Sequence, residues 1–313
     1  MFTTDPLLTD KQPFVKLLVL LLLIVSSTLI TFFVGILIAV PIYGTDVLDN
    51  LVSAGKLITE NDISMMKYFQ VVNQLGVFII PALLFSYLIS RNVFGFLRLN
   101  RKPANMSMII TLFLIFAILP AIHWFVEINE GLQLPGFLSR IEEWMKSSEE
   151  SALRLTEAFL STTTLSGLIV NIFMIGILAA IGEELLFRSL LIRLFSDWTK
   201  NTHVAVVVSS LLFSAFHLQF YGFLPRFILG LIFGYLFVWS GSVWLPIFAH
   251  FLNNVSAVTV YYLVKIGYLQ TDAEQFGSTE NNLFLFSSFV ISILFLATIY
   301  FAEKRKNPIP VKI

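Results

Sequence analysis

Eight long apolar runs constrain this chain more than any other feature of its sequence. A helix needs about 20 mostly apolar residues to cross a bilayer. The runs are Val15–Pro41, Tyr68–Ser90, Met106–Val126, Leu165–Phe187, His203–His217, Pro225–Ser240, Trp244–Val264 and Leu283–Phe301. Only 13% of the 313 residues are charged, against about 25% in a soluble domain. The sequence therefore predicts an all-α membrane protein, a bundle of about eight transmembrane helices.

The fifth and sixth runs, His203–His217 and Pro225–Ser240, are short, and the turn between them, "LQFYGFL", is itself apolar. They either cross the membrane separately or form a re-entrant hairpin, and both arrangements leave the orientation of the other helices unchanged. The first apolar stretch, Phe14 to Tyr43, exceeds the 7–15 residues or so of a signal-peptide core, so we expect an uncleaved membrane helix.

The distribution of Lys and Arg predicts which loops face the cytoplasm, because cytoplasmic loops carry an excess of both. The loops at 44–67, 128–164 and 265–282 are rich in acid, and the tail "EKRKNPIPVKI" is basic. The other segments that we expect to face the cytoplasm contain the basic residues Arg91, Arg98, Arg101, Lys102, Arg188, Arg193 and Lys200. This pattern predicts an integral membrane protein with both termini in the cytoplasm, and we expect the membrane to be a bacterial inner membrane.

The acid-rich loop before the fourth run contains a segment with helical spacing of apolar residues. Its apolar positions are Ile141, Trp144, Met145, Ala152, Leu155 and Phe159. They predict an amphipathic helix lying along the membrane surface or, equally, a solvated linker helix.

A few polar side chains remain inside the apolar runs, where ionisable groups are costly and therefore candidates for function. Glu184 and Arg188 are spaced i,i+4 and can pair on one helix face, whereas Glu183 is turned about 100° away. Phe213 with His217, in "FSAFH", shows the same i,i+4 spacing. So does His250 with Asn254, in "HFLNN".

A carboxylate, two imidazoles and a carboxamide in one apolar bundle can form a hydrolytic site. The carboxylate could take a proton from water, and an imidazole or the carboxamide could stabilise an oxyanion. Glu183, His217 and His250 could instead hold a divalent metal such as zinc. Each residue also has a structural explanation, as a packed polar group or an interfacial ion pair.

Several other classes of protein are excluded or disfavoured. The chain has no cysteine, which excludes thiol nucleophiles, disulfides and thiolate metal sites. It has no H-E-x-x-H zinc-protease motif and no G-x-S-x-G nucleophile elbow. Its formal net charge is zero, which gives no reason to expect a nucleic-acid partner.

The order E-E-x-x-x-R, F-x-x-x-H and H-x-x-x-N resembles the motifs of the CPBP family, also called ABI. The family comprises CAAX prenyl endopeptidases and bacteriocin-processing or self-immunity proteins. The motifs stand here as "EELLFR" at 183–188, "FSAFH" at 213–217 and "HFLNN" at 250–254. The resemblance implies a catalytic core at 161–265. Residues 1–160 would supply the first three helices and residues 266–313 the last helix and tail.

What the resemblance implies is an intramembrane endopeptidase with Glu183 as the catalytic carboxylate. His217 and His250 would orient or activate water, and Asn254 would support the oxyanion. Glu184, Arg188 and Phe213 would support the site. We lean towards Glu-activated water without a firmly implied cofactor, since Asn is a poor zinc ligand.

The resemblance leaves the partner and part of the function open. The expected partners are the bilayer and a peptide or membrane-anchored protein substrate, while the oligomeric state is not indicated. A non-catalytic scaffold or a bacteriocin self-immunity protein is an alternative. A proton-coupled transporter is a weaker one, because no inverted repeat is visible in the sequence.

One geometric difficulty follows from counting residues at about 1.5 Å each. If the fourth helix ends at Phe187 on its cytoplasmic side, Glu183 and His250 lie within about 10 Å of their helix ends, whereas His217 lies about 21 Å in. Straight helices would keep the three apart. The spacing of Gly230 and Gly234 would permit the close packing of a bent or re-entrant arrangement.

Overall fold

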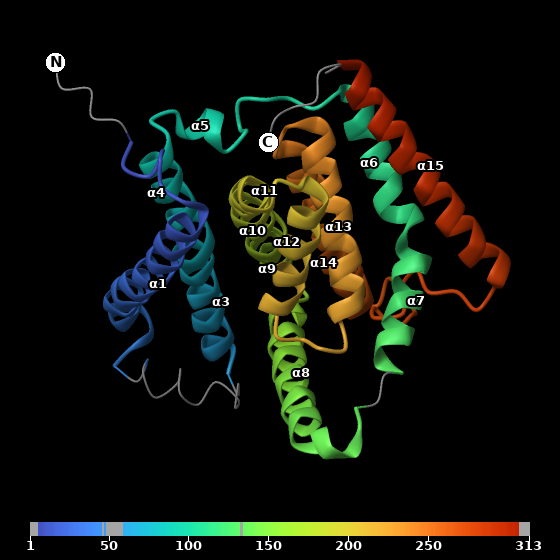
Figure 1. Cartoon of the computed structure of the whole chain (residues 1–313). Coiled ribbons are helices and arrows are strands. Elements are labelled where there is room, and N and C mark those ends of the chain that lie inside the picture. The colour runs from blue at the N-terminus through green and yellow to red at the C-terminus, as the bar shows by residue number, and fades with distance from the viewer. Residues whose placement is uncertain (1–5, 46, 48–58, 132–133, 307–313) are drawn as a thin grey trace.

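The computed structural model describes residues 6–45, 47, 59–131 and 134–306. Parts of the acid-rich loop at 44–67 and of the basic tail lie outside these residues. The elements are α1 Pro13–Tyr43, α3 Glu60–Gln74, η1 Leu75–Ile79, α4 Ile80–Ile89, α5 Val93–Phe96, α6 Asn105–Ala117, α7 Leu119–Glu130, η2 Gly136–Leu138, α8 Ser139–Leu160, α9 Leu165–Asn171, η3 Ile172–Leu178, α10 Ala179–Glu184, η4 Leu185–Ile192, α11 Arg193–Thr199, α12 Thr202–Phe216, α13 Phe223–Ser240, α14 Trp244–Lys265 and α15 Asn282–Lys306. All regular structure in the described residues is helical (Figure 1), which confirms the all-α fold class.

The helices are those of an integral membrane protein. Six are long and apolar enough to cross a membrane, and a seventh arises if α6 and α7, bent by 46°, count as one span. The remaining apolar run forms α12, whose 15 residues fall short of a full span. The described residues thus give six or seven candidate spans where the sequence suggested about eight.

The fourth membrane helix extends much further than the sequence suggested. We expected it to end at Phe187, but it continues without a break from Leu165 to Thr199. Glu184 and Arg188 are both fully buried and paired with each other, so these charges do not need the water that would surround a helix end. Glu183 therefore lies in the middle of the helix, about 24 Å from Thr199.

Three π-helical segments interrupt the helices around this region: η1, η3 and η4. A π-helical turn shifts the backbone hydrogen bonds from i+4 to i+5 and often marks a functional site. η3 and η4 flank α10, the short segment that carries Glu183 and Glu184. η1 packs against α10 closely, since a Cβ at Gly182 would lie 2.9 Å from Cβ of Phe78.

Helices α12 and α13, which correspond to the fifth and sixth apolar runs, form an antiparallel hairpin that is tightly packed at Gly230 and Gly234. A Cβ at Gly234 would lie 2.8 Å from Cγ1 of Val206, and one at Gly230 would lie 3.1 Å from Cβ of Ser210. The expected close packing on Gly230 and Gly234 is confirmed. Whether this hairpin is re-entrant stays a prediction, because the structure contains no membrane.

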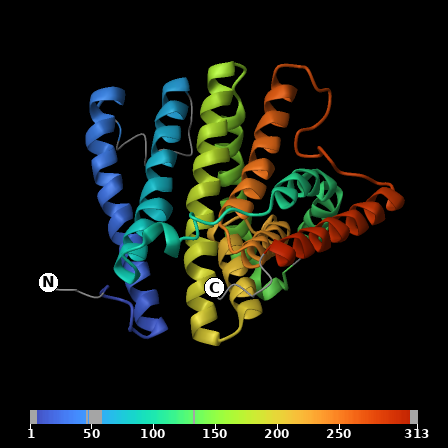
Figure 2. The same ribbon diagram turned by 90° about the horizontal axis from the view of Figure 1, so that it is seen from above.

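The length of the fourth helix explains how His217 reaches Glu183. This helix, α9–α11, is seen end-on in Figure 1 and from its side in Figure 2. Because it runs on to Thr199, Glu183 lies deeper than we expected, and α12 packs beside its second half, where the Ser209 hydroxyl donates to Phe187 O at 2.7 Å. His217 lies about 22 Å from the start of α12, similar to the distance of Glu183 from Thr199.

A segment that we call the strap, residues 97–104, crosses one end of the bundle between α5 and α6 (Figure 1). Five of its backbone carbonyls accept hydrogen bonds from side chains, two of them, those of Lys102 and Pro103, from Lys306 of α15. Leu97 O accepts from Ser189 at 2.9 Å, Leu99 O from the indole of Trp244 at 2.8 Å, and Arg101 O from Ser242 at 2.6 Å. The strap is therefore fixed to η4 and to the start of α14.

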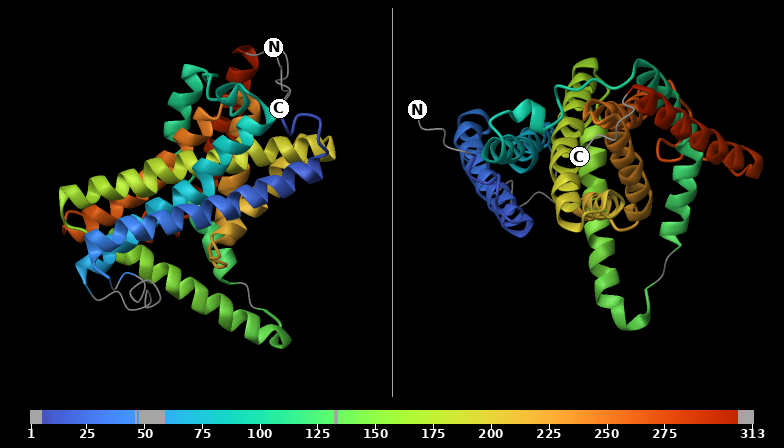
Figure 3. Two further views of the ribbon diagram at one scale, coloured as in Figure 1. Left: turned by 90° about the vertical axis from the view of Figure 1, so that its left-hand side faces the viewer. Right: turned by 45° about the horizontal axis from the view of Figure 1, so that its top comes forward.

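Helix α8 lies at the opposite end of the molecule from the strap, under the loop 217–222 between α12 and α13 (Figures 1 and 3). The amphipathic segment thus forms the expected helix, and its placement on a membrane surface stays a prediction. The Ser148 hydroxyl donates to Leu218 O at 3.0 Å, and Glu149 accepts from the backbone N–H of Tyr221 at 3.2 Å. The rings of Trp144 and Phe220 lie 5.0 Å apart.

The hydrophobic core joins the three segments into which the sequence was divided. One cluster combines Leu20 and Phe85 with Leu186 and Phe213, and a second combines Leu114 with Ile299. Boundaries at 1–160, 161–265 and 266–313 stay a prediction about the sequence, which the packing does not test.

Candidate active site

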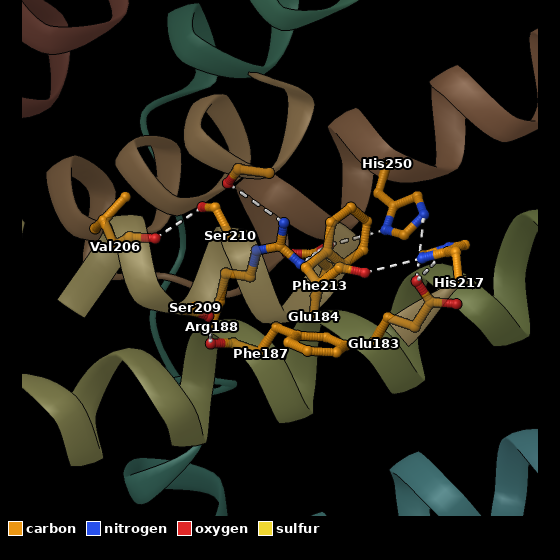
Figure 4. A network of polar contacts seen from close by, with 11 residues as sticks. Glu183, Glu184, Phe187, Arg188, Val206, Ser209, Ser210, Phe213, His217 and His250 are labelled. Atoms are coloured by element: carbon orange, nitrogen blue, oxygen red, sulfur yellow. Dashed lines mark hydrogen bonds and ion pairs between the residues drawn. The ribbon is translucent and has the colours of Figure 1, made fainter. Parts of the chain in front are cut away.

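The structure brings Glu183, His217 and His250 together from three helices (Figure 4). The Glu183 Oε2 atom lies 3.9 Å from Nε2 of His217 and 4.0 Å from Nε2 of His250. These three side chains come from α10, the end of α12 and α14. The convergence expected from the sequence is confirmed, while the chemical roles of the residues stay predictions.

Each imidazole is held in place through its other nitrogen. His217 Nδ1 lies 2.9 Å from the Phe213 carbonyl, and His250 Nδ1 lies 2.8 Å from Oε1 of Glu184. A carbonyl oxygen and an ionised carboxylate can only accept hydrogen bonds. Both Nδ1 atoms must therefore donate, and in the neutral imidazoles both Nε2 atoms are left as acceptors facing Glu183.

Glu184 connects the site to a buried arginine. Its Oε1 atom lies 2.9 Å from Nη1 of Arg188 as well as 2.8 Å from His250. Glu184 and Arg188 are almost completely inaccessible to solvent. Such a pair stays charged in an apolar interior only if the partners satisfy each other, and Arg188 Nη2 gains a further, long bond of 3.4 Å to Gly230 O.

Aromatic rings enclose this network. The Arg188 guanidinium lies 4.3 Å from the centre of the Phe213 ring, within cation–π range. The Phe213 ring packs edge-on against both His217 and His250, and Phe233 stacks on His250 with ring centres 5.3 Å apart. Phe213 thus supports the site with its ring and with its carbonyl.

Exposure differs among the three converging side chains. The His217 side chain is 29% exposed, whereas those of Glu183 and His250 are 9% and 6% exposed. A substrate could therefore approach the carboxylate from the side of His217.

The Oε2 atom of Glu183 is buried and has no hydrogen-bond partner among the described residues. Separations of 3.9 and 4.0 Å to the two imidazoles are too long for direct hydrogen bonds. They are of the size that a bridging water spans. Since the carboxylate and both Nε2 atoms are acceptors, a group between them has to be a donor, as water is.

Asn254 is not part of this network in the structure. It lies one turn after His250 on α14, and its amide nitrogen donates to the Ile175 carbonyl in η3 at 2.9 Å. The Asn254 amide nitrogen has a second N–H. Its proposed role at an oxyanion stays a prediction.

Three residues near the site were missed by the sequence reasoning. Arg226 interacts electrostatically with Glu183 and His217 and binds both the backbone and side-chain oxygens of Gln219. Asn129 of α7 fixes the loop 217–222 from below. Phe233 stacks on His250. Arg226 stands inside a predicted membrane run and was detectable as an intramembrane charge, whereas Asn129 and Phe233 carried no such signal.

The residues as placed do not form a metal centre. Among the described residues, no group of three or more His, Cys, Asp or Glu side chains has metal-binding geometry. Ligand atoms on a tetrahedral zinc ion lie about 3.4 Å apart, and the Nε2–Oε2 separations at Glu183 exceed this. We therefore derive no step through a metal.

Comparison with known proteins supports the family that the three motifs suggested. Residues 165–256, which contain all three motifs, match the family model described as type II CAAX prenyl endopeptidase Rce1-like. A curated protein of Bacillus subtilis (strain 168), described as "Putative membrane peptidase YdiL", is 28% identical over 110 residues. That alignment covers 35% of this chain and 45% of the relative, so the chain spans less than half of the relative's length. No solved structure gives a significant match.

Proposed function

We propose, from the match of residues 165–256 to the Rce1-like family model, that this protein is a membrane endopeptidase of the CPBP family. It hydrolyses a peptide bond with a water molecule activated by Glu183, with His217 and His250 positioning that water. The observation that carries the proposal is the convergence of both Nε2 atoms on the buried Oε2 atom of Glu183.

The reaction begins with water that donates its two protons to Glu183 and His250, two of the three acceptors around it. Glu183 takes a proton from the water, whose oxygen then forms a bond to the carbonyl carbon of the substrate. The carbonyl π electrons move to the oxygen, which becomes an oxyanion. Glu183 then gives the proton to the amide nitrogen as the C–N bond breaks, so that one carboxyl group serves first as base and then as acid.

The two imidazoles differ in their proposed tasks. His250, held by Glu184 and stacked on Phe233, keeps the water in line with Glu183. His217 is more exposed and lies on the side from which a substrate would approach, so it meets the scissile bond first. The second N–H of Asn254 is our candidate donor to the oxyanion.

The chain requires a substrate that reaches a site within a membrane bundle. We propose a peptide or a membrane-anchored protein, cleaved on the cytoplasmic side of a bacterial inner membrane with both termini of the chain in the cytoplasm. The name of the matching family refers to prenylated substrates. The geometry of the site does not require a prenyl group on the substrate of this protein. We propose no nucleic-acid partner.

Cleavage of a reporter peptide by the purified protein in detergent or nanodiscs tests the proposal. The change Glu183→Gln keeps the shape of the side chain and removes the base, so the rate should fall at least about 100-fold. Glu143→Gln, at an exposed position of α8, is the matched control and should keep full activity. Cleavage by Glu183→Gln at the wild-type rate would overturn the role of Glu183, whereas absence of cleavage by the wild type would favour the scaffold or immunity alternative.

Chelation tests the part of the mechanism that uses no metal. We expect the same cleavage rate with and without a strong chelator, because the described residues offer no metal geometry. Loss of activity on chelation, with recovery on addition of zinc, would replace this mechanism by one based on metal-bound water.

A further inference from the structure

A second polar pocket, separate from the Glu183 site, opens where the strap meets α5 and α11. Its volume is about 370 Å³. The polar side chains that line it are Ser90, Asn92, Arg98, Asn100, Arg101 and Arg193. Arg193 lies ten residues after Glu183 on the same helix, about 15 Å away along its axis. None of these residues belongs to the proposed catalytic machinery.

The pocket carries a strong positive charge. Three guanidinium groups line it, and no carboxylate is among the lining residues that the structure describes. Asp197, one turn after Arg193 on α11, attracts Arg193 electrostatically, which leaves a net charge of about +2 for these four groups at neutral pH. Burial, and next the neighbouring Arg101, lower the pKa of Arg98. An anion between the arginines would offset this mutual repulsion.

The arginines stand on a backbone that is fixed by other residues. The guanidinium of Arg193 donates to the Phe96 carbonyl and lies 4.1 Å from the centre of the Phe96 ring. The strap is bound on both sides of Arg98, because Leu97 O and Leu99 O accept from Ser189 and Trp244. The pocket is therefore preorganised, and binding an anion requires little rearrangement.

The pocket also borders the region where lipid headgroups would lie. The strap belongs to the basic loop that the distribution of Lys and Arg places in the cytoplasm. Phe94, next to the lining residue Gly95 on α5, exposes 67% of its surface, as an apolar anchor at a membrane interface does. Basic pockets between membrane helices on this side suit anionic headgroups, and guanidinium forks match phosphate oxygens.

We propose that the pocket formed by Arg98, Arg101 and Arg193 binds the phosphate of an anionic phospholipid of the cytoplasmic leaflet. The lipid ties the strap and α11 to the membrane surface. This inference does not depend on the proposed peptidase activity.

The test measures lipid binding to the full-length protein in detergent, by native mass spectrometry during titration with phosphatidylglycerol or phosphatidylcholine of the same acyl chains. The wild type should retain phosphatidylglycerol selectively. The double variant Arg98→Gln, Arg101→Gln should bind it about thirty-fold more weakly. The backbone carbonyl of Arg101 accepts a hydrogen bond from Ser242. Because only the side chain changes, the substitution keeps this hydrogen bond.

Arg305→Gln is the matched control, since Arg305 is exposed on α15 and does not line the pocket. It should bind phosphatidylglycerol as the wild type does. Near-ultraviolet circular dichroism of each variant checks that the fold is retained. If the double variant unfolds, the milder single variant Arg101→Lys, which keeps the positive charge, should still bind part of the phosphatidylglycerol that the wild type binds. Equal retention of both lipids, or displacement of phosphatidylglycerol by inorganic phosphate at equal concentration, would overturn the proposal.

Discussion

At the scale of single residues, Glu184 is the side chain on which the site geometry depends most. One of its oxygens contacts both Arg188 and His250, so it neutralises a buried cation and fixes the tautomer of an imidazole at the same time. A carboxylate that holds a histidine in this way is a positioning residue, since it does not face Glu183 or the water site.

We predict that Glu184→Gln destabilises the protein by about 3 kcal/mol, because it leaves Arg188 charged and unpaired in the interior. The double variant Glu184→Gln, Arg188→Met removes both charges and should be more stable than the single variant. Thermal unfolding in detergent measures both. A double variant that is less stable than Glu184→Gln alone would contradict the explanation. Measuring kcat and KM for the double variant then isolates positioning: kcat should fall with little change in KM.

We also predict that Phe233→Ala lowers activity by about tenfold through loss of the ring that stacks on His250, and that Phe233→Tyr retains most of it. Truncating a buried Phe costs about 3–5 kcal/mol, so unfolding has to be measured alongside cleavage. Equal activity of Phe233→Ala and wild type would show that the Glu184 contact alone orients His250.

The sequence predicts the members of the site better than their surroundings. The i,i+4 spacing is local, so it correctly indicated that Glu184 pairs with Arg188 and that Glu183 faces elsewhere. Phe233 and Asn129 reach the site from other helices. Their positions depend on how helices cross, which no local spacing encodes.

At the scale of elements, the loop 217–222 decides where His217 lies. The backbone turns sharply after His217, with φ of 53° at Leu218, in a left-handed region that a bulky residue rarely adopts. Three elements hold this turn: α8 through Ser148 and Glu149, α13 through Arg226, and α7 through Asn129. Of these, Ser148, Glu149 and Asn129 lie far from the loop in sequence.

Asn129→Ala is the sharpest test of that positioning. The carboxamide donates to Phe220 O at 2.7 Å and accepts from the Leu224 N–H at 2.8 Å, and its removal leaves two backbone groups without partners at about 1–3 kcal/mol each. We expect faster amide hydrogen exchange in residues 217–222 and about tenfold slower cleavage. Asn105→Ala, exposed at the start of α6, should change neither; unchanged exchange in Asn129→Ala would refute the role.

The end of the fourth helix was the main error at this scale. Hydropathy places a boundary where charges begin, and Glu183, Glu184 and Arg188 looked like such a boundary. Their burial and mutual pairing allow the helix to continue to Thr199. The existence of all eight helical runs was predictable from apolar length alone, because length and hydropathy are the physical requirements for crossing a bilayer.

At the scale of the whole molecule, the two ends of the bundle differ in chemistry. The strap with its arginines occupies one end and α8 with its acidic residues the other (Figure 1). We predict that the strap faces the cytoplasm and α8 the opposite side. The chain has no cysteine, so single-cysteine variants Asn100→Cys and Ser147→Cys, both exposed, can be labelled without background.

In right-side-out membrane vesicles, a membrane-impermeant maleimide should label Ser147→Cys and spare Asn100→Cys. In inverted vesicles the pattern should reverse. Labelling of both variants from one side would mean that the assigned orientation, and with it the leaflet of the proposed lipid, is wrong.

The π-helical segment η4 has a consequence for the whole molecule. It lies between Glu183, which faces the two imidazoles, and Arg193, which faces the strap pocket. Removing one residue from such a segment turns everything beyond it by about 100° relative to everything before it. The extra residue therefore determines the rotation about the helix axis between Glu183 and Arg193. One continuous helix can thus direct Glu183, at its middle, into the bundle interior and Arg193, near its end, towards the proposed lipid pocket.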